Sequence, residues 1–172
     1  MYLINVNKIP MGKIGGTKVT NSQFVCHIKE TEASLYRVAK SILRNNEDCA
    51  DAVQTAILKA YDKLDTLKQE KFFRTWITRI LINECYQTLR NRKELVPYEE
   101  YMSNQENYLE YSEVFEALME LEDMYRIPFS LHYVEGYSTR EIAKFLGISV
   151  SNVKIRLSRA RIKLQKRLEG EK

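Results

Sequence analysis

Apolar residues recur at helical spacing through the first half of this chain. Three stretches, at about residues 24–44, 48–64 and 73–92, each place them on one face of a 3.6-residue repeat. Their apolar stripes are Phe24, Ile28, Leu35, Val38 and Ile42; then Val53, Ala56, Ile57, Ala60 and Leu64; and last Trp76, Ile77, Ile80, Leu81 and Leu89. Asp48 and Asp51 fall in the expected first turn of the second helix, where acids complement the helix dipole. Because the connections are short, we expect a small three-helix bundle.

Residues 94–111 interrupt this pattern, with weak periodicity, Pro97, five Glu and four Tyr. Beyond them, apolar positions at 114–121 and 127–134 predict two further helices, and a final pair completes a second, smaller bundle. The sequence therefore predicts an all-α fold, in which two small helical bundles are joined by an acidic linker and the C-terminal bundle is a helix-turn-helix. We expect four parts: a flexible leader at 1–20, the first bundle at 21–93, the linker at 94–111 and the second bundle at 112–172. Met11, within the leader, is a second candidate start.

The helix-turn-helix prediction is based on residues 137–153. Ser138 followed by Glu141 forms a capping box, which marks the start of a helix. Gly147 can adopt the left-handed conformation that ends this helix sharply, and Ser149 is placed to cap the next one. The buried face of the first helix is expected to contain Ile142, Phe145 and Leu146, with the small Ala143 where the second helix crosses. The second helix has the apolar stripe Val150, Val153, Leu157, Ala160, Leu164 and Leu168.

The opposite face of that second helix is polar and basic, and it carries Ser151, Asn152, Lys154, Ile155, Arg156, Ser158, Arg159 and Arg161. Such a helix, held by a short preceding one, is built to lie in a DNA major groove. Lys154 and Arg159 are placed to reach base edges or phosphates, and Arg156, Arg161 and Lys163 to anchor the backbone. The alternative is an ordinary antiparallel helix pair with a basic exposed face.

Charge is distributed unevenly along the 172 residues, although the net charge is only +4. Residues 68–93 contain seven bases and two acids, residues 94–123 ten acids and no base, and residues 150–172 eight bases and two acids. Two basic blocks that flank an acidic one are the pattern expected of a polyanion-binding protein. Solvated helix faces are the alternative for either block alone. Six Gly and three Pro argue against an all-β fold.

The third helix combines aromatic and basic side chains, namely Phe72, Phe73, Trp76 and Tyr86 with Arg74, Arg79, Arg90 and Arg92. Rings stack on unpaired bases and cations hold phosphates, so this combination suits single-stranded DNA. The alternative is that Phe73 and Trp76 belong mainly to the core.

The remaining chemistry of the chain is sparse. The three cysteines have no C-x-x-C spacing and suit reduced, buried thiols. His27 and His132 lie far apart and match no metal or catalytic-triad spacing, so we expect no metal, no cofactor and no enzyme activity. No stretch approaches the eighteen apolar residues of a membrane span, and we expect a cytoplasmic protein.

Two segments resemble a known family. The sequence DCADAVQTAILKAY at 48–61, followed by FRTWITRI at 73–80, resembles region 2 of bacterial RNA polymerase sigma factors. The helix-turn-helix with VSNVKIRLSRAR at 150–161 resembles region 4. Only these two regions are present, as is characteristic of the extracytoplasmic-function branch, group IV. The similarity covers about residues 22–168.

The resemblance implies a subunit that directs core RNA polymerase to promoters and helps to open them. Residues implied to bind the clamp of the β′ subunit are Asp48, Asp51, Gln54, Thr55 and Leu58. Residues implied to hold the opened −10 element, with one flipped base, are Lys59, Leu67, Lys68, Thr75, Trp76, Arg79 and Asn83. Residues implied to read the −35 duplex are His132, Lys154, Ile155, Ser158 and Arg159. Further implied partners are the β flap and an anti-sigma factor, commonly anchored in the membrane.

The chain departs from the family pattern at three positions, which bear on clamp docking and base preference. Thr55 stands where Glu is usual, Leu67 where Phe is usual, and Gln69 where Gly is frequent. Two other hypotheses remain open. A stand-alone helix-turn-helix regulator would bind duplex DNA without polymerase, and a nucleic-acid enzyme would need catalytic residues that the sequence does not display.

Overall fold

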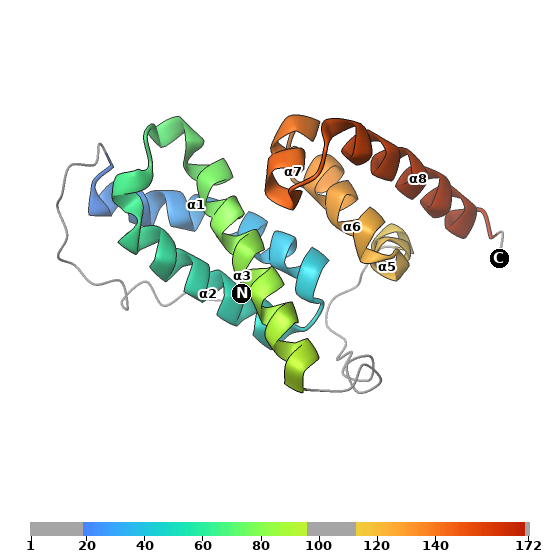
Figure 1. The fold of residues 1–172 in the computed structure, drawn as a ribbon, viewed down its shortest axis with the longest axis horizontal. Helices are drawn as coiled ribbons and strands as arrows, with labels where there is room; N and C mark the ends of the chain where they lie inside the picture. The colour runs from blue at the N-terminus through green and yellow to red at the C-terminus, as the bar shows by residue number, and fades with distance from the viewer. Residues whose placement is uncertain (1–18, 96–112, 171–172) are drawn as a thin grey trace. The chain divides into compact units, whose positions relative to one another are not determined.

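The computed structural model describes residues 19–95 and 113–170, and all their regular secondary structure is helical (Figure 1). The chain divides into two compact units between residues 101 and 102. The predicted all-α fold of two helical bundles is confirmed. The predicted leader lies mostly outside the described residues, and so does most of the predicted linker.

The first unit is a bundle of three long helices. Its elements are α1 (Asn21–Leu43), α2 (Asn46–Asp62), the short 3₁₀ helices η2 (Leu64–Thr66) and η3 (Glu70–Phe72), and α3 (Phe73–Leu95). Each long helix packs against the other two, and their apolar stripes form a closed core. Members of this core that are almost fully buried are Phe24, Ile28, Leu35, Val38, Ile42, Ile57, Ile77, Leu81 and Ile82.

The starts of α1 and α2 lie earlier than the apolar pattern suggests. Thr20 caps α1 through a capping box with Gln23, and Val19 is buried, so both belong to the bundle and not to a leader. The side chain of Asn45 caps α2 by accepting the amides of Glu47 and Asp48. Asp51 therefore lies beyond the first turn, and the prediction that it complements the dipole there is wrong.

The inward face of α3 is rotated from its predicted position. Ile77 and Leu81 are buried as expected, but Trp76, Ile80 and Leu89 are only partly buried. The buried face consists of Phe73, Ile77, Thr78, Leu81, Ile82 and Cys85. Because α3 packs on both α1 and α2, it buries a wide face that includes a threonine and a cysteine.

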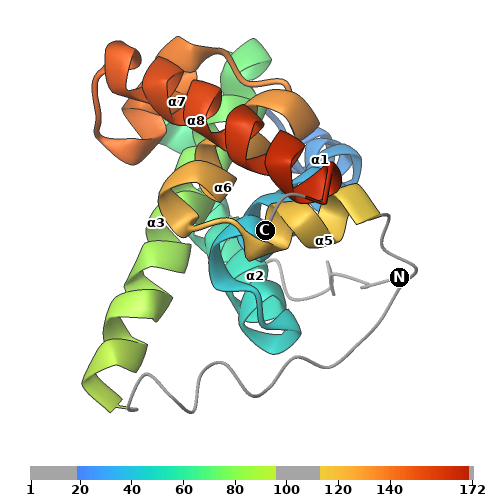
Figure 2. The ribbon, with the colours of Figure 1, turned by 90° about the vertical axis from the view of Figure 1, so that its right-hand side faces the viewer.

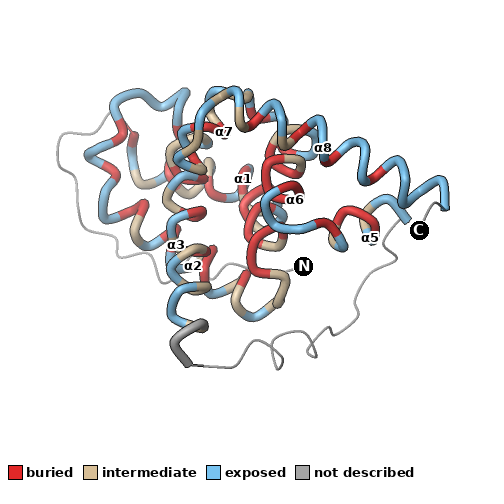
Figure 3. The backbone as a smooth tube through the Cα atoms, turned by 45° about the vertical axis from the view of Figure 1, so that its right-hand side comes forward, coloured by how far each residue is buried: buried red, intermediate tan, exposed pale blue. Residues whose placement is uncertain are grey.

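The second unit packs its helices around α8. Its elements are α5 (Glu113–Glu120), α6 (Asp123–Phe129), a π-helical turn at Ser130–Val134, α7 (Thr139–Leu146) and α8 (Val150–Leu168). Helices α5, α6 and α7 each contact α8 (Figure 2). The buried positions of α6 and α8 appear as red segments in Figure 3, and pale blue segments mark the exposed positions of α8. Leu168, predicted to be on the buried stripe, is 39% exposed.

A fully buried arginine holds the corner between α5 and α6. The guanidinium of Arg126 donates to the backbone oxygen of Leu121 and to the Asp123 carboxylate, each at 2.7 Å. A buried guanidinium must have its donors satisfied, since an unpaired one would cost several kcal/mol. Both acceptors belong to the residues of the turn itself, so Arg126 fixes the angle at which α6 leaves α5.

The Gly147 turn provides a test of the helix-turn-helix geometry. Gly147 has φ 64°, and a Cβ there would meet nothing within 4 Å, so alanine would be strained by its backbone conformation alone. We expect Gly147→Ala to lower the free energy of unfolding of the second unit by about 1 kcal/mol, and Gly147→Asn by less, because Asn tolerates this conformation. The measurement is urea unfolding followed by circular dichroism. Trp76, the sole tryptophan, reports the first unit separately by fluorescence. Equal losses for Ala and Asn would contradict the argument.

Thiol reactivity tests the burial of the cysteines. None is in a disulfide, and Cys26 is exposed, so the prediction that all three thiols are buried is wrong for Cys26. Burial raises the pKa of Cys49 to about 12 and that of Cys85 well above its usual range. At pH 8 both therefore stay protonated and unreactive. A chromogenic disulfide reagent should titrate one thiol in the native protein and three after denaturation. Cys26→Ser should remove the native signal, and a rapid second equivalent would disprove the burial.

Candidate nucleic-acid interface

The helix-turn-helix forms with the local contacts that its sequence predicts. The Ser138 hydroxyl accepts the amide of Glu141 at 3.3 Å, and the Glu141 carboxylate accepts the amide of Ser138 at 3.0 Å. Gly147 ends α7 in the left-handed conformation, and Ser149 caps α8 by accepting the amide of Asn152 at 3.1 Å. These caps fix the path of the chain between the two helices.

The N-terminal half of α8 presents the predicted contact residues to solvent. Exposed members of the set are Ser151, Lys154, Ile155, Ser158 and Arg159, together with Arg161. Asn152 and Arg156 are half-buried, and the Arg156 Nε donates to Asn152 Oδ1 at 3.0 Å. Among the described residues, no ion pair or hydrogen bond engages the side chains of Lys154 and Arg159. These two cations are therefore available to an external anion.

The C-terminal half of α8 is basic too, but two of its bases, Lys163 and Arg167, are paired with acids inside the unit. Lys163 Nζ lies 3.0 Å from Glu122 Oε1 and 5.1 Å from the centre of the Tyr125 ring. Arg167 makes two hydrogen bonds to the Glu120 carboxylate, at 2.6 and 3.0 Å. Hydrogen bonding to Arg167 lowers the pKa of Glu120, and the same bonds raise the pKa of Arg167. Lys163, expected to anchor a phosphate backbone, is instead held against α6.

His132 lies in the π-helical turn before α7 and not on α8. Its Nδ1 is 2.8 Å from the backbone oxygen of Tyr137, an acceptor, so this nitrogen carries the proton. The other ring nitrogen remains to meet a ligand. The hydrogen bond also links the turn to the residue that precedes the capping box of α7.

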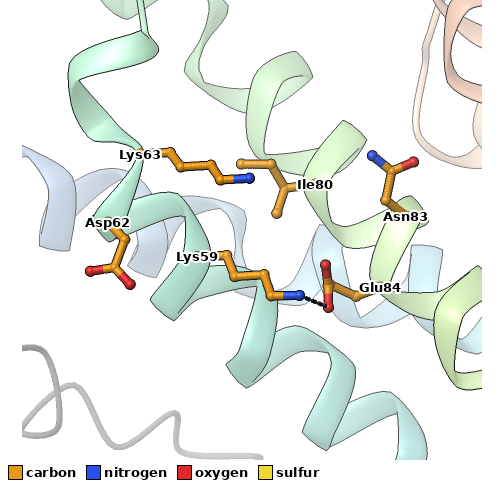
Figure 4. A pocket seen from close by; sticks show the side chains of 6 residues that line it. All are labelled: Lys59, Asp62, Lys63, Ile80, Asn83 and Glu84. Carbon is orange, nitrogen blue, oxygen red and sulfur yellow. Dashed lines mark hydrogen bonds and ion pairs between the residues drawn. The ribbon is translucent and has the colours of Figure 1, made fainter.

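In the first unit, the predicted −10 residues lie on two helices and the segment between them. Lys59 on α2 and Asn83 on α3 line one pocket, shown in Figure 4, together with Asp62, Lys63, Ile80 and Glu84. Lys59 Nζ reaches across the pocket to Glu84 Oε2 at 2.6 Å. Lys59 is thus paired within the protein, although a stronger anion could replace this partly exposed carboxylate. Sequence reasoning missed Glu84 because its partner is 25 residues away.

The other −10 residues differ in accessibility. Lys68 and Arg79 are exposed, Thr75 and Trp76 are half-buried, and Leu67 is buried. Leu67 therefore anchors the segment between α2 and α3, and in this conformation its side chain offers little surface to DNA. Of the aromatic residues on which the single-strand hypothesis was based, Phe73 is core, Trp76 and Tyr86 are half-buried and Phe72 is 51% exposed.

The predicted polymerase-binding residues follow one face of α2. Asp51, Thr55 and Leu58 are exposed at helical spacing and Gln54 is half-buried. Asp48 differs, because its carboxylate lies 2.5 Å from the Arg92 guanidinium on α3. Burial raises the pKa of Asp48, and the Arg92 charge opposes this by lowering it. Asp48 is thus committed to joining α2 and α3.

Residues 19–95 and 113–170 contain no group of three His, Cys, Asp or Glu side chains that could hold a metal ion. No helix there is both long and apolar enough to cross a membrane.

Comparisons with known proteins find a family model that matches each of the two units. Residues 28–94 match the family model "Sigma-70 region 2", and residues 111–164 match "Sigma-70, region 4". RNA polymerase sigma factor SigV of Bacillus subtilis is 30% identical over 148 residues, which cover 83% of this chain and 89% of SigV. ECF RNA polymerase sigma factor SigM of Mycobacterium tuberculosis is 30% identical over 142 residues, 78% of this chain and 71% of SigM.

Two solved structures are also similar. CnrH, solved in complex with the cytosolic domain of CnrY, has a TM-score of 0.64 and 27% identity, covering 89% of this chain and 92% of CnrH. The sigma factor RpoE of Bartonella quintana, in complex with the anti-sigma factor NepR, has the same fold, with a TM-score of 0.75 and 24% identity over 88% of this chain and 99% of RpoE. This chain belongs to the sigma-70 family of RNA polymerase sigma factors, in its extracytoplasmic-function branch.

Proposed function

We propose that this protein is a promoter-specificity subunit that acts without catalysis, directing core RNA polymerase to defined promoters and assisting their opening. The observation that carries this proposal is the presence, in one chain, of matches to region 2 and region 4 with an unpaired basic face on α8. A stand-alone helix-turn-helix regulator is not favoured, because it leaves the match at 28–94 without a role. Since the proposed partners are polymerase and DNA, the site of action is the cytoplasm.

The second unit is proposed to read duplex DNA at the −35 element. Its N-terminal α8 face combines cations, which neutralise phosphates, with short polar side chains that can approach base edges. Ile155 is 51% exposed and would contact a thymine methyl group. Lys163 and Arg167, nearer the end of α8, are already paired within the unit, so the contact is proposed for the first turns of the helix.

The first unit is proposed to hold the opened −10 strand on Lys68, Thr75, Trp76, Arg79 and Asn83. Extruding a base costs a few kcal/mol of stacking, and a site that accepts the extruded base repays this cost only for the correct sequence. The pocket between α2 and α3 offers Asn83 and two lysines for this purpose, beside the acids Asp62 and Glu84. Phosphate binding there would exchange the Lys59–Glu84 pair for a contact with DNA.

The exposed α2 face is proposed to bind the β′ clamp, and the second unit to contact the β flap. An anti-sigma factor is proposed as a third partner. Support comes from RpoE, whose structure contains the anti-sigma factor NepR, and from CnrH, whose structure contains the cytosolic domain of CnrY. A partner with a cytosolic domain is consistent with an anti-sigma factor anchored in the membrane.

Run-off transcription tests the proposed function directly. Purified full-length protein is added to core polymerase with fragmented genomic DNA as the template. Defined start sites should appear only when the protein is present, and the sequences upstream of them should share two elements. Failure to obtain any defined start, with a known sigma factor active in parallel, would refute the proposal.

Substitution of the unpaired cations of α8 tests the −35 surface. Lys154→Ala and Arg159→Ala should each weaken binding to promoter duplex by about tenfold and reduce the slope of log affinity against log salt by about one, because fewer counterions are released. Fluorescence anisotropy over a salt series measures both quantities. Lys163→Ala is the matched control, because its charge is already paired with Glu122. An equal loss in this control would show that overall charge, and not the α8 face, determines binding.

Charged substitutions on α2 test the proposed polymerase-binding face. Asp51→Arg and Leu58→Asp should each reduce the affinity for core polymerase by at least about tenfold, because interface energy concentrates in a few central residues. Binding of the −35 duplex should not change. Ala33→Asp adds an acid at an exposed position on α1 and serves as the control. Wild-type binding by both α2 variants would place the interface elsewhere, and an equal loss in Ala33→Asp would show that the effect is not specific to α2.

A further inference from the structure

A side-chain contact joins α1 to the segment between α2 and α3, and the proposed function does not use it. His27 Nε2 on α1 lies 2.8 Å from Glu70 Oε1, at the first residue of η3. The imidazole also stacks on the Phe73 ring, with centroids 4.8 Å apart and planes inclined by 27°. His27 therefore contacts both the segment and the first residue of α3.

The segment has few other attachments to the bundle. Leu67 is buried where it begins and Phe73 where it ends, but all five residues between them are exposed. The bond from the Phe72 amide to the Gln69 oxygen, at 3.0 Å, is local. Among the hydrogen bonds, ion pairs and ring contacts of the described residues, the His27–Glu70 pair is the one that joins the middle of the segment to another helix. A surface segment with so few contacts opens easily unless this tie holds.

The charges around the ring give the tie a second effect. Glu70 is an acid among Lys68, Lys71 and Arg74, so a free carboxylate there would repel DNA phosphates. The titratable groups that contact the imidazole are Glu70 from the segment and Glu30 from α1, the latter 3.5 Å from Nδ1. Phe73 contributes only an aromatic ring.

The Nε2–H of His27 donates to the Glu70 carboxylate and so holds this acid against α1. This contact acts in two ways. A loose segment would misplace Lys68, and a carboxylate without a donor would repel phosphates, so the contact favours binding of an opened DNA strand on both counts.

We infer that His27 is a positioning residue for the −10 surface: through Glu70 it holds the segment that carries Lys68, and it thereby strengthens binding of opened promoter DNA. This inference rests on the proposed function, because it concerns the same surface. The pair is partly exposed, with side chains 26% and 43% accessible, so the effect on affinity is a few-fold modulation.

The test uses holoenzyme assembled from core polymerase and the full-length chain. The probe is a promoter duplex, mapped by the run-off experiment, whose −10 segment is held open by mismatches. His27→Ala should weaken binding of this probe by about three- to tenfold, as expected for loss of one hydrogen bond to a charged group. Binding of the −35 duplex and of core polymerase should stay at the wild-type level.

Two further variants separate positioning from general destabilisation. Because both residues act through one contact, the double variant His27→Ala/Glu70→Gln should lose no more affinity than the worse single variant. Glu30→Gln, which alters the other carboxylate beside the ring, is the matched control and should bind the probe as the wild type does. Amide hydrogen exchange should accelerate at 68–72 in His27→Ala and remain unchanged in α2.

The possible results are distinguishable. If the wild type starts no transcription, the proposed function fails before this test begins. If the wild type is active but His27→Ala binds the opened probe equally well, the positioning role is refuted. If His27→Ala also weakens binding of the −35 duplex and of core polymerase, the contact serves only the stability of the bundle and the inference is again refuted.

Discussion

The burial of Phe73 against Phe24 determines the arrangement of the first unit. Phe24 on α1 meets Phe73 on α3 edge to face, at 5.6 Å, and meets Tyr61 on α2 in the same way at 5.5 Å. One ring thus joins all three helices, and each such pair contributes about 0.5–1.5 kcal/mol beyond the area that it buries. Because Phe73 is also the first residue of α3, this packing sets where the surface segment ends and which face of α3 looks outward.

Charge pairing divides the second unit in a comparable way. Bases occur along the whole of α8. Lys163 and Arg167 pair with acids of the α5–α6 region, whereas Lys154 and Arg159 have no such partner among the described residues. Pairs on the surface add little to stability. Their effect is on function, since they remove positive charge from one part of the helix and leave it at the other.

Local features of this fold could be predicted from the sequence, because their partners lie within four residues. Ser138, Gly147 and Ser149 occupy the capping positions that their types indicated. Features that depend on packing could not. The outward rotation of Trp76 reflects the contact of α3 with two helices at once, and the Lys59–Glu84 pair joins residues that no periodicity relates. The assignment of functional residues on both surfaces came from the family resemblance, and the structure adds which of them are free to act.

The two ion pairs between α8 and the α5–α6 turn also concern how the protein can be handled. Arg167 and Lys163 pair with Glu120 and Glu122, which lie at this turn. Pairs this exposed contribute little to stability, but they lie on the last two turns of α8. An affinity tag or fluorescent fusion joined here needs a spacer that keeps its own charges away from these pairs, and a deletion that removes Arg167 would release the Glu120 carboxylate while leaving Lys154 and Arg159 in place.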